Sequence, residues 1–472
     1  MASTILQLSK LISDATAVIT DSCAGAGTAV PELDAPFDPA QEAWRQRPGV
    51  QLAVDQAISA AHQLIATLQP APLSVLRMGG SYHITATRVA FESNVATIIK
   101  ELGGNGVHVD AIAVKAKVDP KKLVRVLRFL ASQHVFREIE PDVFANNRIS
   151  SCFDIGKPFS ELVSNPVTKY EGTSGITALF GHMMDEMSKS GAYAWEALSD
   201  PKTAFSEEPE DAPLSRAFGT HITFWDWMEE PEQVNRLARF GVAMRAWQNT
   251  LPADAMLHGF NWLSLTENDL IVDVAGGIGN AVLPIARANP AVRVIIQDRP
   301  AVIDDGIKYW NEEYPEALDS GRVKLEIRDL FAAQPIKNAS VFLLRRILHD
   351  WSDKYVRKIL TTLREAAAPS TKLLIIDSIM HYVCADPTLS KAGVVPGWAS
   401  ARRPDAPPPL LPNWGTVGIG TYGSDLHMMI LHNSQERTLT HLSTLLESTG
   451  WRMVRVYPDQ TNLMSQVEAV PI

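Results

Sequence analysis

The sequence predicts an α/β protein in which a doubly wound domain follows a helical domain with a winged-helix outline. After about Leu265, short apolar runs rich in β-branched residues alternate with helical patterns, as in a parallel sheet that is buried on both faces. Before about residue 150, apolar residues recur at helical spacing and a short hairpin pattern closes the segment. These two patterns give the expected order of the domains.

Length and composition agree with this interpretation. The 472 residues allow about three domains, which we expect at residues 1–150, 151–260 and 261–472. Apolar residues make up 46% of the chain and charged residues 20%, so a packed core is expected and a largely disordered chain is excluded. The net charge of −10 disfavours nucleic acid and anionic membranes as partners.

Signals for targeting and for metal binding are absent from the sequence. It contains no apolar run of about 18 residues, and residues 1–21 lack the pattern of a secretory signal. We therefore expect a soluble cytoplasmic protein without a membrane partner. The scattered Cys23, Cys152 and Cys384 are too few for a disulfide framework or a zinc site, so no metal is expected.

The spacing of apolar residues predicts the elements of the first domain in order. Residues 5–19 and 50–68 form two amphipathic helices on either side of a loop rich in Ala, Gly and Pro. Three shorter helices follow, and Asp119-Pro120 caps and starts the last of them. The predicted ranges are 95–102, 110–116 and 120–131 for these helices and 135–139 and 143–145 for the strands of the hairpin.

Basic residues on the last two helices raise a DNA-binding hypothesis, because a winged helix presents such a helix to the major groove. The alternative is that they solvate the outer face of a helix pair used for packing or dimerisation. The chain is acidic and has no other basic stretch, so packing is the favoured interpretation. The residues concerned are Lys115, Lys117, Lys121, Lys122, Arg125 and Arg128.

Residues 151–260 are predicted to be mostly helical and are rich in methionine and aromatic side chains. At helical spacing, a single such residue belongs to a core more often than to a ligand site. As a group, they also suit a flat apolar pocket for a ring-shaped ligand. They include Phe180, Met183, Met184, Met187, Tyr193, Trp195, Phe224, Trp225, Trp227, Met228, Met244 and Trp247.

Five short apolar runs predict the parallel strands of the last domain, and one segment interrupts it. From about 385 to 423, prolines and glycines predict a long insertion without regular structure near the ligand edge of the sheet. A helix over 438–449 and strands near 452–457 and 464–469 end the chain. The five runs are 270–274, 292–297, 323–327, 341–344 and 373–376.

A glycine-rich turn, Asp273-Val274-Ala275-Gly276-Gly277-Ile278-Gly279-Asn280, follows the first strand. Glycines there let the backbone approach a ligand. The dinucleotide fingerprint is incomplete, because Val282 stands at its third position, and the Gly-Lys-Ser/Thr of a Walker loop is absent from the sequence. Acidic residues at the ends of the first two strands, Asp273 and Asp298, suit a ligand with an amino group and a ribose.

The order of these features resembles the S-adenosylmethionine-dependent methyltransferases. More narrowly, Leu343-Leu344-Arg345-Arg346-Ile347-Leu348-His349-Asp350-Trp351-Ser352-Asp353 resembles the signature of plant and fungal O-methyltransferases that act on phenolic and other secondary metabolites. The resemblance continues through Ile376-Asp377-Ser378, Asp425 with Met428, and Glu436-Arg437-Thr438. It implies a Rossmann-like methyltransferase domain, S-adenosylmethionine as the cofactor, and an N-terminal winged-helix domain that forms a homodimer.

The resemblance also implies that His349 is the general base. Methyl transfer to a phenol removes one proton, and the phenol pKa is about 10, so a base that is neutral near pH 7 assists the reaction. Such a histidine needs a carboxylate at its other ring nitrogen. Asp377 and Glu436 match the family's two acidic partners, and Asp377 is one methylene shorter than the glutamate of many plant members.

The remaining assignments concern the cofactor and the acceptor. The resemblance places the glycine turn at the methionine part of the cofactor, Asp298 at the ribose and Asp329-Leu330-Phe331 at the adenine. The expected cofactor residues are Asp273, Gly276, Gly277, Gly279, Asp298, Asp329, Leu330, Phe331 and Arg345. The expected acceptor residues are Phe180, Met184, Trp247, Met428 and Asn433.

Two hypotheses stand beside methyl transfer to an aromatic hydroxyl. One takes a carboxyl group as the acceptor, which is already ionised at pH 7 and needs no base. The other is a methyltransferase-like protein that catalyses a rearrangement or acts as a regulator; the presence of His349, Glu436 and the glycine turn argues against it. Dimerisation is expected through the first 150 residues, where Leu8, Leu11 and Ile12 belong to an apolar surface too large for an exposed helix.

Overall fold

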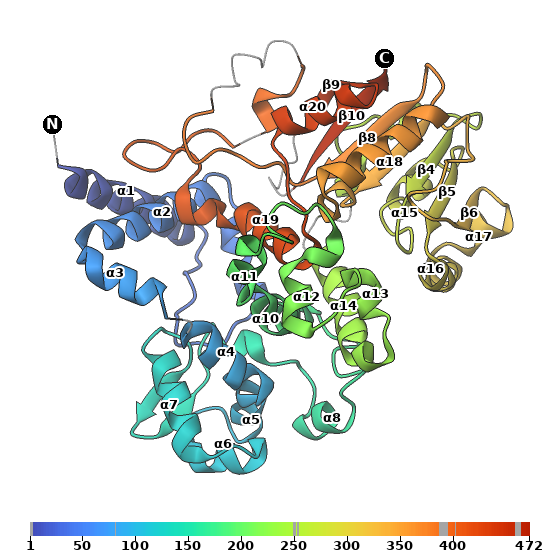
Figure 1. Ribbon diagram of the computed structural model, residues 1–472. Helices are drawn as coiled ribbons and strands as arrows, with labels where there is room; N and C mark the ends of the chain where they lie inside the picture. Colours follow the sequence, from blue (N-terminus) through green and yellow to red (C-terminus); the bar gives the residue numbers. More distant parts are fainter. Residues whose placement is uncertain are drawn as a thin grey trace. The chain divides into compact units, whose positions relative to one another are not determined.

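The computed structural model describes residues 3–80, 82–248, 252, 254–386, 395–401, 403–457 and 464–472 (Figure 1). The chain forms two compact units, and each is described by itself. The first contains Met1–Lys189, Trp225–Thr250 and Ala406–Val417, and the second contains Ser190–Phe224, Leu251–Asp405 and Gly418–Ile472. These units cut across the three expected segments, because residues 151–260 are divided between them and residues 406–417 belong to the first unit.

A seven-stranded sheet forms the centre of the second unit and confirms the predicted α/β class. Its order is β6-β5-β4-β7-β8-β10-β9; the first five strands of this order are parallel, and β10 is antiparallel to both of its neighbours. Each predicted apolar run lies in one of the parallel strands. The strands are β4 Leu270–Val274, β5 Arg293–Asp298, β6 Val323–Ile327, β7 Val341–Arg345, β8 Lys372–Asp377, β9 Trp451–Tyr457 and β10 Ser465–Pro471.

Side chains of the central strands alternate between two apolar cores, one on each face of the sheet. In β4, Val272 packs with α18 and α20, whereas Ile271 packs with α15 and with Trp310 of α16. Burial on both faces explains why the strands are continuous apolar runs. The strand order reverses between β4 and β7, so their carboxyl ends form the crevice where such sheets bind ligands. The helices of this unit include α15 Leu283–Ala288, α16 Pro300–Glu313, α17 Pro315–Asp319, α18 Asp353–Ala366, α19 Ile419–His432 and α20 Leu439–Ser448.

The first unit contains the predicted winged-helix arrangement. Three helices are followed by the hairpin of β2 and β3, and the short strand β1 pairs with β3. Asp119 caps α7 as expected, since its Oδ1 accepts a hydrogen bond from the Lys121 amide at 2.7 Å. The elements are α1 Thr4–Gly25, α2 Val50–Leu68, α3 Ala71–Met78, α4 Tyr82–Glu92, α5 Val95–Glu101, β1 Val107–His108, α6 Val109–Ala116, α7 Pro120–Ala131, β2 Arg137–Glu140 and β3 Val143–Ala145.

Helices α8 to α14 connect these two regions of the sequence. The described helices are α8 Phe159–Ser164, α9 Ile176–His182, α10 Ser188–Gly191, α11 Ala194–Ser199, α12 Pro213–Phe218, α13 Phe224–Met228 and α14 Val234–Gln248. A π-helical turn, Met183–Met187, separates α9 from α10. Among the described residues of 151–260, helices and helical turns are the regular elements and no strand occurs, which agrees with the predicted helical segment.

Two of the basic side chains on the winged helix are paired with carboxylates. The Arg128 guanidinium donates to Glu138 and to Asp142, and Lys115 donates to Glu101 at 2.8 Å. These pairs reduce the positive potential that phosphate groups would require. The arrangement favours the packing interpretation, and the absence of a nucleic-acid partner stays a prediction.

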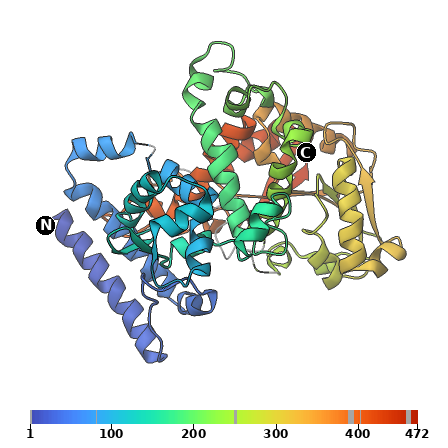
Figure 2. The same cartoon turned by 90° about the horizontal axis from the view of Figure 1, so that it is seen from below.

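The long helix α1, dark blue in Figure 2, packs along α2. Part of the insertion packs against apolar side chains of both helices. Leu8 is fully buried in a cluster with Ala60, Leu410 and Trp414, and the Ser59 hydroxyl donates to the Trp414 carbonyl at 2.8 Å. Leu11 and Ile12 are partly buried against the same cluster. Their apolar character is therefore explained within one chain, and the expectation that Leu8, Leu11 and Ile12 mark the dimer surface is corrected.

The insertion is more ordered than predicted. Its residues 387–394 and 402 lie outside the described residues. Trp398 packs into the core of the second unit, and the Val456 amide donates to the Pro396 carbonyl at 2.9 Å. Helix α19 begins at Ile419, within the range expected to lack regular structure. Glycine weakens a helix by about 1 kcal/mol relative to alanine, and burial of its later turns at Met428, Ile430 and Leu431 outweighs the glycines of its first turns.

No helix of the described part of the chain is long and apolar enough to cross a membrane.

Replacing Leu8 tests whether the insertion covers α1. Leu8→Ala should lower the free energy of unfolding of the first unit by about 2–5 kcal/mol, because it leaves a cavity beside Trp414. Urea denaturation followed by tryptophan fluorescence measures this change. Leu6→Ala on the exposed side of α1 serves as the matched control. Equal effects of the two substitutions would contradict the packing described here.

Candidate active site

The glycine turn after β4 is shaped by close contacts. The amide groups of Gly277 and Arg299 each donate to Asp298 at 2.7 Å, which fixes the carboxylate at the end of β5. A Cβ atom at Gly276 would lie 2.4 Å from the Asp273 carboxylate. At Gly279, where φ is +79°, it would lie 2.4 Å from the Ile296 side chain. Both positions therefore require glycine.

Asp273 carries a deeply buried carboxyl group at the end of β4. Neither of its oxygens has a hydrogen-bond partner among the described residues, and the side chain is 1% exposed. Burial raises its pKa to about 7, against the opposing attraction of the nearby Arg345 guanidinium. Such a group is costly unless a cation or a donor completes it. The turn thus fits a ligand that carries an amino group.

The other expected cofactor residues lie at or shortly after the carboxyl ends of β5, β6 and β7. Burial raises the pKa of Asp298 even though two backbone amides stabilise its charge. Asp329 is exposed after β6, and its Oδ1 accepts from the Phe331 amide at 2.9 Å. Phe331 packs edge-on against Trp351 with ring centroids 4.7 Å apart, while Leu330 borders the same core. Burial and the neighbouring Arg346 lower the pKa of Arg345 to about 10.

His349 lies at the end of β7, in a 3-10 turn over Leu348–Asp350 rather than in the first turn of α18. Its ring is buried, and its Nδ1 lies 2.9 Å from Oε1 of Glu436. Its Nε2 lies 3.5 Å from Oδ1 of Asp350. One ring nitrogen is therefore held by a carboxylate, as a base histidine requires.

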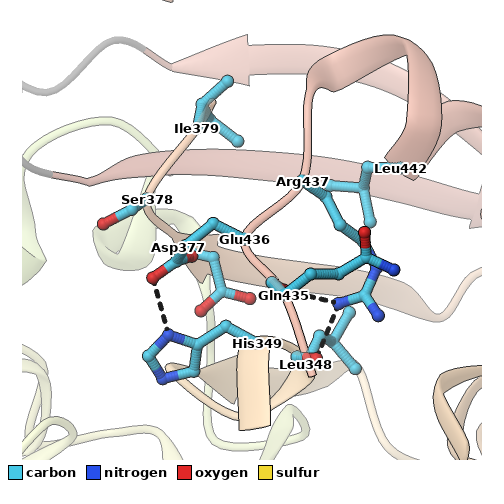
Figure 3. Close-up of a pocket in the computed structure, with 9 residues that line it drawn as sticks. All are labelled: Leu348, His349, Asp377, Ser378, Ile379, Gln435, Glu436, Arg437 and Leu442. Atoms are coloured by element: carbon cyan, nitrogen blue, oxygen red, sulfur yellow. Dashed lines mark hydrogen bonds and ion pairs between the residues drawn. The ribbon is translucent and has the colours of Figure 1, made fainter. Parts of the chain in front are cut away.

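Two residues of α19 hold Glu436 in place. The Ser424 hydroxyl donates to Oε1 of Glu436 at 2.7 Å, and the Glu436 amide donates to Asp425 at 2.9 Å. Asp377, at the end of β8, lines the same small cavity as His349 and Glu436 (Figure 3). Its Oδ1 has no hydrogen-bond partner within the described part of the chain. Of the two expected acidic partners, Glu436 therefore bonds to the imidazole and the shorter Asp377 lies beside it.

Burial and charge shift the pKa values of this group in opposite directions. Burial favours the neutral imidazole, but the carboxylates of Asp350 and Glu436 outweigh it and raise the pKa of His349 to about 9. His349 in turn holds the pKa of Glu436 below its ordinary value. Burial raises the pKa of Asp377 to about 7 and that of Asp350 to about 6. The site therefore favours an ion pair between His349 and Glu436, so His349 is charged at pH 7, whereas the sequence predicted a base that is neutral near this pH.

Two of the expected acceptor residues lie in the second unit. Met428 is buried on α19. Asn433 ends this helix at a φ of 54°, and its Nδ2 donates to the carbonyls of Ser206 and Glu208, both at 2.9 Å. Its amide protons are committed to the backbone, which gives Asn433 a structural role at the end of this helix, and its expected contact with the acceptor stays a prediction.

The other three expected acceptor residues lie in the first unit. Phe180 stacks on Phe153 and meets Phe91 edge-on, each at 5.0 Å between ring centroids, which is a packing environment. Met184 lies in the π-helical turn and Trp247 near the end of α14; both are partly buried. Their part in substrate binding stays a prediction.

Two residues that hold the site in place were not predicted from the sequence. Ser424 stands twelve residues from Glu436 with no spacing that would indicate their contact. Arg437 was visible only as the neighbour of Glu436, yet its guanidinium binds the turn that carries His349.

The chain is similar in sequence and in fold to known O-methyltransferases. A family model for the O-methyltransferase domain matches residues 195–394. The chain is 41% identical to 4-O-methyltransferase 1 of Phanerochaete chrysosporium, with 100% of both chains covered. It is 39% identical to an O-methyltransferase of Armillaria gallica, covering 97% of this chain and 96% of that protein. The crystal structure of OxaC in complex with SAH and oxaline has the same fold, with a TM-score of 0.67, 19% identity and 100% of both chains covered.

The charge of Glu436 should be visible in the titration of His349. Glu436→Gln removes a neighbouring negative charge, so the pKa of His349 should fall from about 9 towards its ordinary value of about 6.5. NMR of protein labelled at the histidine imidazole carbon measures this pKa. Glu447→Gln, which changes an exposed glutamate of α20, should leave it unchanged. An unaltered titration in Glu436→Gln would contradict the ion pair.

Proposed function

We propose that this chain, which belongs to the S-adenosylmethionine-dependent O-methyltransferase family, methylates a hydroxyl group of a small aromatic secondary metabolite. In this proposal His349 is the general base. The observation that carries the proposal is the buried contact of 2.9 Å between the His349 Nδ1 and Glu436. With Nδ1 held by Glu436, Nε2 is the ring nitrogen left to accept a proton, and it lies 3.5 Å from Oδ1 of Asp350.

S-adenosylmethionine supplies an electrophilic methyl group on a sulfonium centre. The residues that would hold it are those around the glycine turn. The unpartnered Asp273 carboxylate suits the amino group, and Asp298 keeps acceptor capacity for ribose hydroxyls, because each of its oxygens receives one backbone amide. The full set is Asp273, Gly276, Gly277, Gly279, Asp298, Asp329, Leu330, Phe331 and Arg345.

The raised pKa of His349 suits a phenolic acceptor. An ordinary imidazole is about 3.5 pKa units below a phenol of pKa about 10, which makes proton transfer unfavourable. At a pKa of about 9 the imidazole nearly matches the phenol. Glu436 and Asp350 stabilise the imidazolium that forms, so the proton leaves the phenol as the new bond develops. The imidazole must first be neutral, so the rate should rise with pH towards about 9.

The nature of the acceptor is supported by a relative and by the apolar side chains. The fungal relative at 41% identity is named a 4-O-methyltransferase, a name that places its methyl group on an oxygen at a numbered position. For this chain we retain Phe180, Met184, Trp247, Met428 and Asn433 as the acceptor residues. Asp377, with a raised pKa beside His349, remains the second acidic residue of the site.

The two alternatives fit the site less well. A carboxyl acceptor is ionised already and has no use for a buried His349–Glu436 pair. A regulator or a rearrangement enzyme has no need of a base matched to a phenol. Neither alternative explains why α19 holds Glu436 through Ser424 and Asp425.

We place the protein in the cytoplasm as a homodimer. Cys23, Cys152 and Cys384 are free thiols, which suits a reducing compartment. Helix α3 leaves an apolar face uncovered, since Leu76 is 73% and Met78 is 84% exposed. Exposed apolar side chains of α2 extend this surface: Leu52, Ile58, Ile65 and Leu68. A second copy of the same surface would bury both.

Replacing His349 tests the proposed base. His349→Ala should lower kcat on a phenolic acceptor by a factor on the order of 10²–10⁴, measured with a labelled methyl donor. Calorimetry should show unchanged binding of S-adenosylmethionine and no binding of NAD. His258→Ala, at an exposed histidine of the same unit, should keep full activity. A near-normal rate in His349→Ala would reject the base and favour a carboxyl acceptor.

The dimer surface is tested by a charge on α3. The wild-type protein should be a dimer by multi-angle light scattering, and Leu76→Glu should be a monomer, because the glutamate would be desolvated at the interface. Leu263→Glu, at an exposed leucine of the second unit, should remain a dimer. A monomeric wild-type protein would rule out the proposed association.

A further inference from the structure

Arg437 is a buried arginine that binds two backbone carbonyls on either side of His349. Its side chain is 5% exposed. Nη1 donates to the Leu348 carbonyl at 2.7 Å, and Nη2 donates to the Trp351 carbonyl at 2.7 Å (Figure 3 shows the first of these bonds). The turn that contains His349 and Asp350 is therefore held at both ends by one guanidinium.

A carboxylate fixes the orientation of this guanidinium. Asp353 accepts from Nε of Arg437 at 3.0 Å and lies 2.9 Å from Nη2. The same carboxylate receives His441 at 2.7 Å, and its pKa is lowered to about 2 by these partners despite burial. A planar guanidinium held in this way reaches the two carbonyls from two different nitrogen atoms in a fixed geometry, which the single nitrogen of lysine does not reproduce.

The backbone of Arg437 belongs to the same assembly. Its carbonyl accepts from the Met380 amide at 3.0 Å, and it forms a parallel bridge with Ile379, shortly after Asp377. Its chain neighbour is Glu436. One residue thus connects the three segments that carry His349, Asp377 and Glu436.

We propose that Arg437 is a positioning residue that sets the distance and angle between the His349 imidazole and the Glu436 carboxylate. The inference deepens the proposed function and rests on it. Arg437 does not act on the acceptor itself; it holds the carbonyls of Leu348 and Trp351 so that the ring faces Glu436. A displacement of about 1 Å at a catalytic group can lower the rate on the order of 10²-fold.

A second arginine of the same unit provides a matched control. Arg364 on α18 also donates to two backbone carbonyls, those of Gly450 and Ile472, both at 2.9 Å. These carbonyls lie directly before β9 and directly after β10, where the two strands pair, rather than beside His349. Its loss should affect folding without affecting the base.

The experiment compares Arg437→Lys with Arg364→Lys in the full-length chain, so that the charge is kept in both. Arg437→Lys should lower kcat about 10²-fold while the affinity for S-adenosylmethionine, measured by calorimetry, stays at the wild-type value. The rising limb of its pH–rate profile should move to lower pH, because a longer contact with Glu436 stabilises the imidazolium less. Arg364→Lys should keep the wild-type kcat and pH profile, whatever its change in melting temperature.

Two further variants separate the possible results. Guanidinium at low concentration should partly restore the rate of Arg437→Ala and should not restore that of His349→Ala. If Arg437→Lys retains wild-type kcat and pH profile while His349→Ala is inactive, the positioning role is rejected and the base stands. If His349→Ala is active, the proposed base itself fails. Equal losses in Arg437→Lys and Arg364→Lys would reduce Arg437 to a general structural role and overturn the inference.

Discussion

The arrangement of the site in the second unit depends on one buried contact, which joins the His349 imidazole and the Glu436 carboxylate. Both groups lose water on folding, and a buried pair that loses one partner costs about 3–5 kcal/mol. The two residues are 87 positions apart, so the sheet, the 3-10 turn after β7 and the loop after α19 must bring them together. Hydrogen bonds of Ser424, Asp425 and Arg437 keep the two groups aligned.

Charge balance in the crevice explains several of the shifted pKa values. Asp273, Asp350 and Asp377 all have raised pKa values, because burial removes the water that would stabilise their charge. The cations that act on these carboxyls are Arg345, Arg346, Arg437 and the imidazolium of His349, and burial outweighs their attraction. Asp273 differs from the others, because neither of its oxygens has a hydrogen-bond partner among the described residues. The amino group of the cofactor would supply a partner for this carboxylate.

The sequence was sufficient for the sheet and for the positions of the acidic residues at its edge. Continuous apolar runs report burial on two faces, and residues that follow parallel strands must meet at one edge. His349, Asp377 and Glu436 were found in this way together with the family resemblance. The structural role of Asn433 and the order of the insertion were not predicted, because a helix end and a tertiary contact leave no periodic pattern. Leu8 packs against Leu410 and Trp414, which lie some 400 residues further along the chain, and no local pattern indicates this contact.

The path of the insertion has a consequence for protein engineering. Residues 406–417 pack with α1 and α2, while the segments before and after them belong to the α/β unit. A chimera that takes residues 1–189 from a relative and keeps the rest of this chain would therefore pack the relative's N-terminal helices against Trp414 of this chain. The exchangeable module is discontinuous, and a functional hybrid has to carry the 406–417 segment together with the N-terminal helices. Recombination at a single junction near residue 150 would divide a shared core.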